Sequence, residues 1–264
     1  MVDLDPIDKA RKAVTERAEL PGMSLMEHLN ELRKRIIHSF VWIAIGVVIA
    51  YIFHVRLIEY IQRPLLAIGL KMTMTHPTDA LNFLIKTSVV CGIIIASPFV
   101  LYQVWLFISP GMYAHEKKYV VPFMGATVGL FLAGAWFGYR WVLPGAMTFL
   151  IQDIGKNFTH MITIEDYTQF FLSVILGLGI CFELPILMFF LSLFGIADGK
   201  FFLRQWRYAI LIIFLISAII CPLQDPFSMC LFASPMLGLY IVGVAVSWYV
   251  HPNRRKAKEA KTTA

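Results

Sequence analysis

The chain has 264 residues, of which 58% are hydrophobic and 15% charged, and its formal net charge is +6. The mean hydropathy is +0.70, and the apolar residues form long blocks instead of the short periodic patches of a soluble core. This pattern is typical of a polytopic membrane protein. The basic residues lie at the ends of the apolar blocks, where orientation signals belong. This placement argues against nucleic-acid binding.

The two ends of the chain are polar. Residues 1–22 are charged and finish at Pro21-Gly22, which predicts a mobile or weakly helical N-terminal extension. The first apolar block begins near Ile36 and lacks both a short basic region and a small-residue cleavage site, so we expect no cleaved signal peptide. Residues 251–264 form a basic tail, which we expect to be cytoplasmic.

Between these ends, residues 23–250 contain six apolar blocks. Each block should be a helix, because an open sheet cannot satisfy its backbone in lipid. The predicted spans lie near 36–53, 87–108, 119–142, 167–196, 208–221 and 228–250. The fifth span, at about 1.5 Å per residue, reaches only about 21 Å across a hydrocarbon core of about 30 Å. The bilayer should therefore thin at this helix, or neighbouring helices should shield it.

Lysine and arginine are distributed unequally between the two sides of the predicted bundle. The N-terminal tail carries 7, the loops near 109–118 and 197–207 carry 2 and 3, and the C-terminal tail carries 5, which gives 17; the other side carries 6. The positive-inside rule then places both termini in the cytoplasm.

Prolines interrupt the apolar blocks. Pro98, Pro185 and Pro235 lie within predicted spans and should kink them, whereas Pro144 suits the end of a helix. Bent helices create cavities, although membrane helices also tolerate proline without a special role.

The sequence lacks the common motifs for nucleotide binding, metal-dependent hydrolysis and serine hydrolysis. The sequence has no phosphate-binding G-x-x-x-x-G-K-[ST] loop, no HExxH and no GxSxG, and its seven histidines are scattered. The four cysteines lie in or beside apolar blocks without a CxxC pair, which gives little support to a zinc site or a disulfide framework. We therefore expect no metal and no cofactor, and an enzyme is the weak interpretation.

The stretch HLNELRKRI, residues 28–36, places His28, Glu31, Arg33 and Arg35 at the cytoplasmic end of the first span. At helical spacing Glu31 and Arg35 are i,i+4 neighbours that could form an ion pair. A basic flank that only sets orientation is the alternative. It would explain the arginines but gives no reason for the carboxylate.

A second polar site follows the second span. The chain leaves the membrane near Phe107 and carries Glu116 in a tight cytoplasmic loop between Pro110-Gly111 and Pro122. Glu116 beside two lysines could be a solvated charge cluster, but its place between two helix ends fixes its position.

The third site is Glu183, which stands alone in the apolar stretch GICFELPILMFF. A charged side chain at bilayer depth costs at least about 2.5 kcal/mol, so this carboxyl should be neutral, paired or exposed to water inside the bundle. It precedes Pro185 by two residues, where a freed backbone would let water or another helix approach. A structural hydrogen-bond anchor is the alternative.

Four stretches in this order resemble the TatC family, the polytopic core of the twin-arginine protein translocase: HLNELRKRI, LYQVWLFISPGMYAHEK, FELP, and DPFS with the later Ser234-Pro235. The resemblance runs from about residue 24 to 250. It implies a curved, cup-shaped bundle of six helices in the bacterial cytoplasmic membrane. This bundle binds the twin-arginine signal peptide of a folded cargo protein. It then assembles with TatA-type and TatB-type single-span proteins in a multimeric complex driven by the proton gradient.

The resemblance also implies roles for individual residues. Glu116 would receive the paired arginines of the signal, Phe107 would be the aromatic residue beside it, and the motif of His28, Glu31, Arg33 and Arg35 would complete the signal site. Glu183 would approach a partner helix inside the membrane, and Asp225 would be an acid on the outer side.

Two departures from the family pattern stand in the last part of the chain. Ile241 occupies a position where many relatives carry glutamate, and CPLQDP is one residue longer than the usual turn. A proton-coupled secondary transporter with Glu183 as its proton site is the alternative function, although no matching halves of an inverted repeat are visible.

Overall fold

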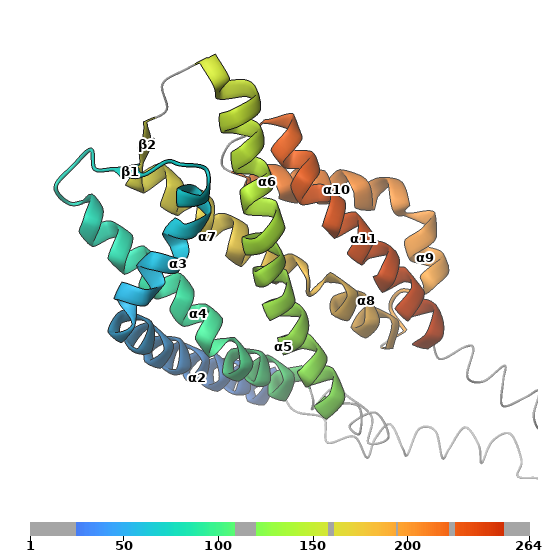
Figure 1. The fold of residues 1–264 in the computed structure, drawn as a ribbon. Helices are drawn as coiled ribbons and strands as arrows, with labels where there is room; N and C mark the ends of the chain where they lie inside the picture. The colour runs from blue at the N-terminus through green and yellow to red at the C-terminus, as the bar shows by residue number, and fades with distance from the viewer. Residues whose placement is uncertain (1–24, 109–119, 158–160, 194, 222–224, 251–264) are drawn as a thin grey trace, which may run out of the picture.

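The computed structural model describes residues 25–108, 120–157, 161–193, 195–221 and 225–250 (Figure 1). The predicted extension 1–22 and the tail 251–264 lie outside these ranges. The described elements are, in chain order, α2 (Leu25–Ile52), α3 (His54–Ala67), β1 (Met72–Thr73), α4 (Asp79–Ile108), α5 (Val120–Phe137), η3 (Gly138–Val142), α6 (Leu143–Thr148), η4 (Phe149–Ile154), η5 (Gly155–Asn157), β2 (Ile162–Thr163), α7 (Ile164–Cys181), α8 (Leu184–Leu193), α9 (Gly199–Arg204), α10 (Trp206–Ile220) and α11 (Pro226–Val250).

Apolar helices of different lengths occupy the described parts of the six predicted spans. By length and composition, four helical stretches of the described ranges could cross a membrane: Met26–Ile52, Asp79–Ile108, Ile164–Leu193 and Pro226–Trp248. The predicted third span corresponds to α5 and η3, and the short fifth span corresponds to α10. The helix α2 already includes Leu25, where the described residues begin, so the motif at residues 28–36 is helical throughout.

The third span does not end at Pro144, contrary to the prediction. The helical path continues from α5 through η3, α6 and η4 to Ile154, and Figure 1 shows it as one long column. The segment that directly precedes α6 is π-helical, and Pro144 stands at the start of α6. Proline disrupts a helix because it cannot donate its i→i−4 hydrogen bond. A change to the wider π turn just before Pro144 lets the chain pass the proline without ending the helix.

The fourth span is broken where the sequence predicts a kink at Pro185. The helix α7 ends at Cys181, Phe182 and Glu183 form a turn, and α8 begins at Leu184. The Glu183 N–H donates to the Ile180 carbonyl at 3.0 Å, three residues back, which closes this turn. Pro185 then lies in the first turn of α8, where its missing N–H costs little.

Pro98 and Pro235 lie inside helices that run without interruption. In each case a serine precedes the proline. The Ser97 hydroxyl donates to the Ile94 carbonyl at 2.8 Å, and the Ser234 hydroxyl donates to the Leu231 carbonyl at 3.2 Å. These carbonyls stand four residues before the prolines, so they are the acceptors that the missing N–H groups would have used. Each Ser-Pro pair thus satisfies the backbone group that its proline leaves open.

The helices α2 and α4 pack along one another through small residues. A Cβ atom on Gly46 would lie 2.3 Å from the Gly92 carbonyl oxygen, and one on Gly92 would lie 2.6 Å from the Val47 Cα. Ala50 and Ala96 are buried on the same helices. Small residues let membrane helices approach closely and gain van der Waals contact. This close pairing sets the relative position of the two helices that carry the candidate site.

The amphipathic helix α3 was not predicted. Its buried residues, Ile61 and Leu65, join the largest core cluster, which also contains Tyr167 and Phe170 of α7. The Tyr167 hydroxyl donates to the Ile61 carbonyl at 2.6 Å. The strands β1 and β2 pair in parallel next to this cluster. Together these contacts join the segment between the first two spans to the start of α7.

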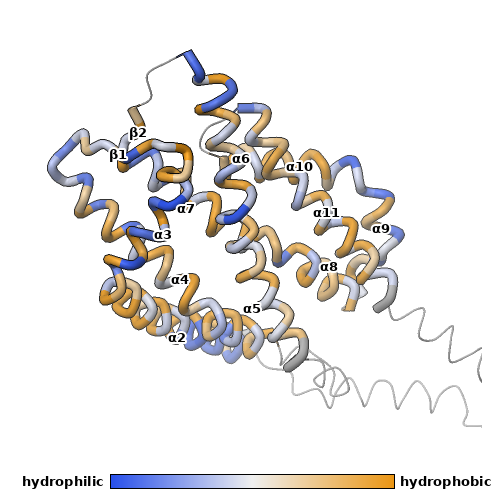
Figure 2. Tube along the Cα trace, viewed as in Figure 1, coloured by the Kyte–Doolittle hydropathy of each residue, from blue (hydrophilic) through white to orange (hydrophobic). Residues whose placement is uncertain are grey.

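The surface of the bundle is strongly apolar. Figure 2 shows hydrophobic residues along α4, α10 and α11, whereas hydrophilic residues gather in the loop before α4 and around α9. Exposed fractions reach 67% for Phe40 on α2 and 76% for Ile219 on α10. Apolar surface of this extent on several helices indicates contact with lipid or with other helices.

The glycine contact between α2 and α4 generates the first prediction. We expect Gly92→Leu to separate the two helices at a cost of about 1–3 kcal/mol, because the new side chain would meet backbone atoms that cannot move aside. The measurement is thermal unfolding of the purified protein in detergent. Gly129→Leu on α5 is the matched control, since a Cβ atom there would meet nothing within 4 Å. Equal losses of stability in the two variants would contradict the prediction.

Candidate functional site

Three polar side chains meet where the beginning of α2 lies beside the end of α4. Arg35 Nη2 donates to Glu31 Oε1 at 3.1 Å, and Arg35 Nη1 donates to Gln103 Oε1 at 3.3 Å. The predicted i,i+4 ion pair is therefore confirmed. The guanidinium of Arg35 bridges a carboxylate on its own helix and an amide on α4, so it links the two helices.

This polar group is mostly enclosed but not fully satisfied. The side chains of Arg35 and Glu31 are only 23% and 15% exposed. Glu31 Oε2 and Arg35 Nε are buried and find no hydrogen-bond partner in the described part of the chain. A partly exposed ion pair contributes only about 1 kcal/mol at most. An enclosed acceptor oxygen without a partner is unfavourable, so a donor that reached Glu31 Oε2 would remove this cost.

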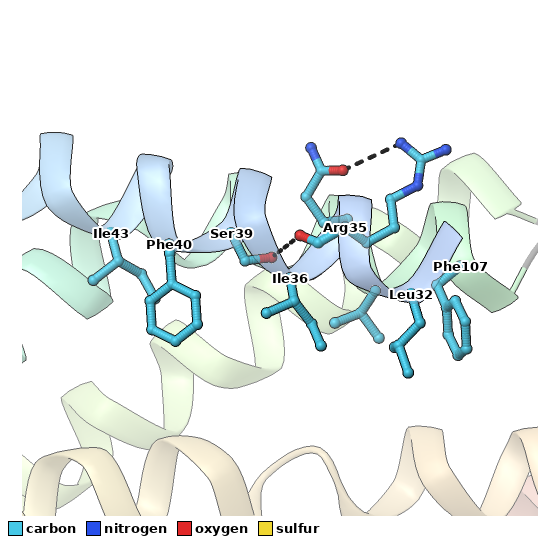
Figure 3. A pocket seen from close by; sticks show the side chains of 9 residues that line it. Leu32, Arg35, Ile36, Ser39, Phe40, Ile43 and Phe107 are labelled. Atoms are coloured by element: carbon cyan, nitrogen blue, oxygen red, sulfur yellow. Dashed lines mark hydrogen bonds between the residues drawn. The ribbon is translucent and has the colours of Figure 1, made fainter. Parts of the chain in front are cut away.

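An apolar pocket of about 280 Å³ lies beside the polar group. Its walls come from α2 and α4 and are formed by Leu32, Arg35, Ile36, Ser39, Phe40, Ile43, Gln103, Val104 and Phe107. In Figure 3 the side chains of Leu32, Ile36, Phe40 and Ile43 extend from the same side of α2, whereas the guanidinium of Arg35 points away from them. The helical repeat explains this division, because these apolar positions recur every three or four residues.

An aromatic pair stands at the rim of the pocket. The rings of His28 and Phe107 stack with centroids 4.6 Å apart and an interplanar angle of 25°. His28 is exposed and Phe107 is half-buried. The structure thus brings His28, Glu31, Arg35 and Phe107 to one place, as the sequence motif and the helix end suggested. Arg33 lies on the same helix and is exposed.

Glu116 lies outside the described residues. Gln103, by contrast, was not singled out from the sequence although it is only 6% exposed and holds Arg35. Gln103 is a single amide side chain in the apolar stretch LYQVWLF. Because a buried amide needs a hydrogen-bond partner, the sequence could have identified Gln103 as a residue that binds a polar group.

Glu183 lies apart from this group, in the turn between α7 and α8. Its Oε1 atom is buried and has no hydrogen-bond partner among the described residues. The turn is held on both sides, since Phe182 packs so closely on α5 that a Cβ atom on Gly134 would lie 2.7 Å from its ring. Leu184 packs against the buried cluster of Met236 and its neighbours. The helix break therefore fixes a carboxyl group in a largely apolar setting with one of its oxygens unpaired among the described residues.

Asp225 has a local structural role. Its Oδ2 atom accepts a hydrogen bond from the Ser228 N–H at 2.7 Å, which caps the start of α11, and Pro226 fills the first helical position. Asp225 Oδ1 and the Ser228 hydroxyl are buried without a partner in the described ranges. Residues 222–224 of the longer turn lie outside the described part. Ile241, at the departure from the family pattern, is 69% exposed on α11.

The sequence did not predict the salt bridge between Lys86 of α4 and Glu165 of α7, in which both side chains are more than 40% exposed. Within the described ranges, no three His, Cys, Asp or Glu side chains are arranged to hold a metal ion.

The arrangement at α2 and α4 suits a ligand with two parts. A carboxylate oxygen that lacks a partner can accept donors from a cationic group, and a guanidinium offers a planar fork of such donors. The adjoining pocket can receive apolar side chains. A peptide that combines arginine with apolar residues therefore fits the chemistry of this site.

Comparison with known proteins places the chain in a family. It matches the model of the Sec-independent protein translocase protein (TatC) over residues 27–235. It is 49% identical over 262 residues to the TatC protein of Koribacter versatilis, with 97% of this chain and 96% of that protein covered. Identity to the TatC protein of Deinococcus radiodurans is 35% over 235 residues, with 87% of each covered.

A solved structure agrees with the fold. The crystal structure of a twin arginine translocase receptor, TatC, matches with a TM-score of 0.77 and 36% sequence identity, over 85% of this chain and 99% of that one. This match confirms the expected all-α architecture of a six-helix membrane protein. The chain belongs to the TatC family of Sec-independent protein translocase proteins.

Proposed function

We propose that this chain is the signal-peptide receptor and assembly core of a twin-arginine translocase, which exports folded proteins. The observation that carries the proposal is the apolar pocket between α2 and α4, which is lined in part by Arg35, the residue whose guanidinium pairs with the enclosed Glu31. The family assignment favours this function over the proton-coupled carrier that the sequence left open. In this role the chain binds and assembles and does not catalyse a reaction.

The signal peptide is held by both of its parts. Glu31 and Glu116 accept hydrogen bonds from the paired arginines, and His28 and Phe107 form the aromatic edge of the site. The apolar segment of the signal lies against Ile36 and its neighbours in the pocket. Two partly shielded ion pairs and apolar burial add up to an affinity that neither supplies alone.

Arginine is preferred to lysine at such a site because of geometry. The guanidinium presents two parallel N–H donors to one carboxylate, whereas the ammonium group of lysine acts as a point charge. Arg33 and Arg35 belong to the same motif on α2, and Arg35 compensates the charge of Glu31 while the site is empty.

Glu183 recruits the transmembrane helices of TatA-type and TatB-type partners in a multimeric complex. Support comes from the unpartnered Oε1 in the turn between α7 and α8. Apolar contacts discriminate poorly between helices in lipid, whereas one buried polar group specifies register and direction. Asp225 keeps the start of α11 in place on the outer side.

The protein lies in the bacterial cytoplasmic membrane, with both termini in the cytoplasm. The excess of lysine and arginine on the side of the termini supports this orientation. The proton gradient supplies energy, since about 2.3 kcal/mol is available per charge for each 100 mV.

Neutralising either acid of the signal site should weaken signal binding. We expect Glu31→Gln and Glu116→Gln each to reduce binding of a twin-arginine signal peptide about fivefold, because each removes one charged acceptor worth about 1 kcal/mol. The measurement is site-specific crosslinking of the peptide to the full chain in membranes. Glu59→Gln, at an exposed acid of α3, is the control and should bind normally. Undiminished binding by both site variants would overturn the receptor proposal.

Replacing Glu183 should weaken assembly with partner helices without lowering the thermal stability of the chain. We expect Glu183→Leu to unfold at the same or a higher temperature, because it removes a buried acceptor that has no partner. Crosslinking of partner helices to this variant should fall at least tenfold, while Glu183→Gln retains part of it through its amide. Native levels of partner crosslinking in Glu183→Leu would show that the carboxyl group plays no part in docking.

A further inference from the structure

One side of α10 carries a row of exposed side chains with a cation at one end. Arg207, Leu211, Leu215 and Ile219 follow one another at intervals of four residues, so they lie on the same side of the helix. Arg207 is exposed, and the exposed fractions of the three apolar side chains are 68%, 60% and 76%. We call these four residues the α10 stripe.

The opposite side of α10 holds the helix against the bundle. Ile213 and Ser217 are buried, and the Ser217 hydroxyl donates to Met236 Sδ of α11 at 3.7 Å. Ile213 and Met236 also belong to one buried cluster. Because α10 is fixed by this side, the α10 stripe faces away from α11.

Positive charge continues from the stripe into α9. Lys200 and Arg204 are exposed and stand four residues apart, and Arg207 follows Arg204 by three residues. None of the three forms an ion pair with another described residue. Residues 199–220 contain no acid, and Asp198 is engaged in capping the start of α9. These cations are therefore available to an anionic partner.

Contacts with α11 place α9 near one end of the bundle. A Cβ atom on Gly199 would clash with the ring of Trp248, close to the end of α11. The Tyr240 hydroxyl donates to the Phe202 carbonyl at 2.8 Å. The cations thus lie on the side of the C-terminal tail, which is the cytoplasmic side in the orientation proposed above.

Aromatic residues stand where the cations meet the apolar part of the stripe. Trp206 and Tyr208 flank Arg207, and both are exposed. Tryptophan and tyrosine concentrate at the boundary between a membrane and water. Arg207 therefore stands at the depth of the lipid headgroups, and the apolar part of the stripe extends from there into the hydrocarbon region. Figure 2 shows the same change from hydrophilic residues around α9 to hydrophobic residues along α10.

We propose that the α10 stripe and the cations of α9 form a binding site for an anionic phospholipid of the cytoplasmic leaflet. Arg204 and Arg207 hold the phosphodiester, since a guanidinium presents a fork of donors that matches phosphate oxygens. One acyl chain lies along the leucines and the isoleucine of the stripe. This site is separate from the signal site on α2 and α4 and does not depend on signal recognition.

A phospholipid suits the α10 stripe better than a transmembrane helix does. Membrane helices pack closely where small residues let their backbones approach, as Gly46 and Gly92 do between α2 and α4. The stripe contains only arginine, leucine and isoleucine. A flexible acyl chain can follow these large side chains, and an anionic headgroup compensates cations that have no acid beside them.

The test measures lipid binding to the full chain in detergent by native mass spectrometry, with phosphatidylglycerol and phosphatidylcholine of the same acyl chains. We expect the native chain to prefer phosphatidylglycerol. Arg204→Gln and Arg207→Gln should each lower the affinity for phosphatidylglycerol about fivefold, which corresponds to about 1 kcal/mol per cation. Arg207→Lys should keep most of the affinity, because it keeps the charge. Undiminished binding of phosphatidylglycerol by both glutamine variants would overturn the proposal.

Two controls separate this site from general attraction. Arg56→Gln and Lys156→Gln each remove one exposed cation elsewhere in the chain and should bind phosphatidylglycerol normally. A loss equal to that of Arg207→Gln would assign the effect to net charge and contradict the site. Glycerol phosphate, which has an anionic phosphate but no acyl chains, should not displace phosphatidylglycerol at equal concentration. Displacement would leave the apolar part of the stripe without a role and overturn the phospholipid site.

A photoreactive amino acid in place of Leu211 identifies the neighbour of the stripe in native membranes. Attachment to phospholipid is the expected result, and it should decrease when Arg204→Gln and Arg207→Gln are combined in the same chain. Attachment to a single-span protein without a lipid adduct would assign the stripe to a protein interface and overturn the proposal.

Discussion

The backbone of a helix in lipid has to satisfy its own hydrogen bonds, and the rest of this structure depends on that constraint. The prolines show how strictly it is met. Ser97 and Ser234 supply the hydrogen bonds that Pro98 and Pro235 cannot make, and a π-helical turn precedes Pro144. Near Pro185, by contrast, the helix breaks at Phe182 and Glu183. The carboxyl group of Glu183 therefore lies in the break itself.

The two candidate functional acids differ in how their charge is compensated. Glu31 is held by Arg35, which Gln103 of α4 holds in turn, whereas Glu183 has a buried oxygen without a partner in the described ranges. Removing one partner of an enclosed ion pair leaves an uncompensated charge, which is costly. A carboxyl oxygen without a partner in an apolar setting is likewise unfavourable. The two acids thus differ in structure: Arg35 pairs with Glu31, whereas one oxygen of Glu183 has no partner within the described ranges.

Packing of small residues connects these sites to the fold. The contact of Gly46 with Gly92 brings α2 so close to α4 that Arg35 reaches Gln103. On the other side of the bundle, the side chain of Met188 on α8 packs onto Gly243 of α11. Because apolar side chains gain little from leaving lipid for one another, close packing at small residues is what fixes these helix pairs. The geometry of the polar sites follows from it.

The sequence alone indicated the all-α membrane architecture, the Glu31–Arg35 pair and a kink at Pro185, because each depends on residues close together in the chain. It did not reveal that Gln103 completes the site, that α3 packs on Tyr167, or that the helix passes Pro144. These features depend on which distant groups come within hydrogen-bonding and packing distance. Local propensity carries no information on such contacts, so only the tertiary structure could decide them.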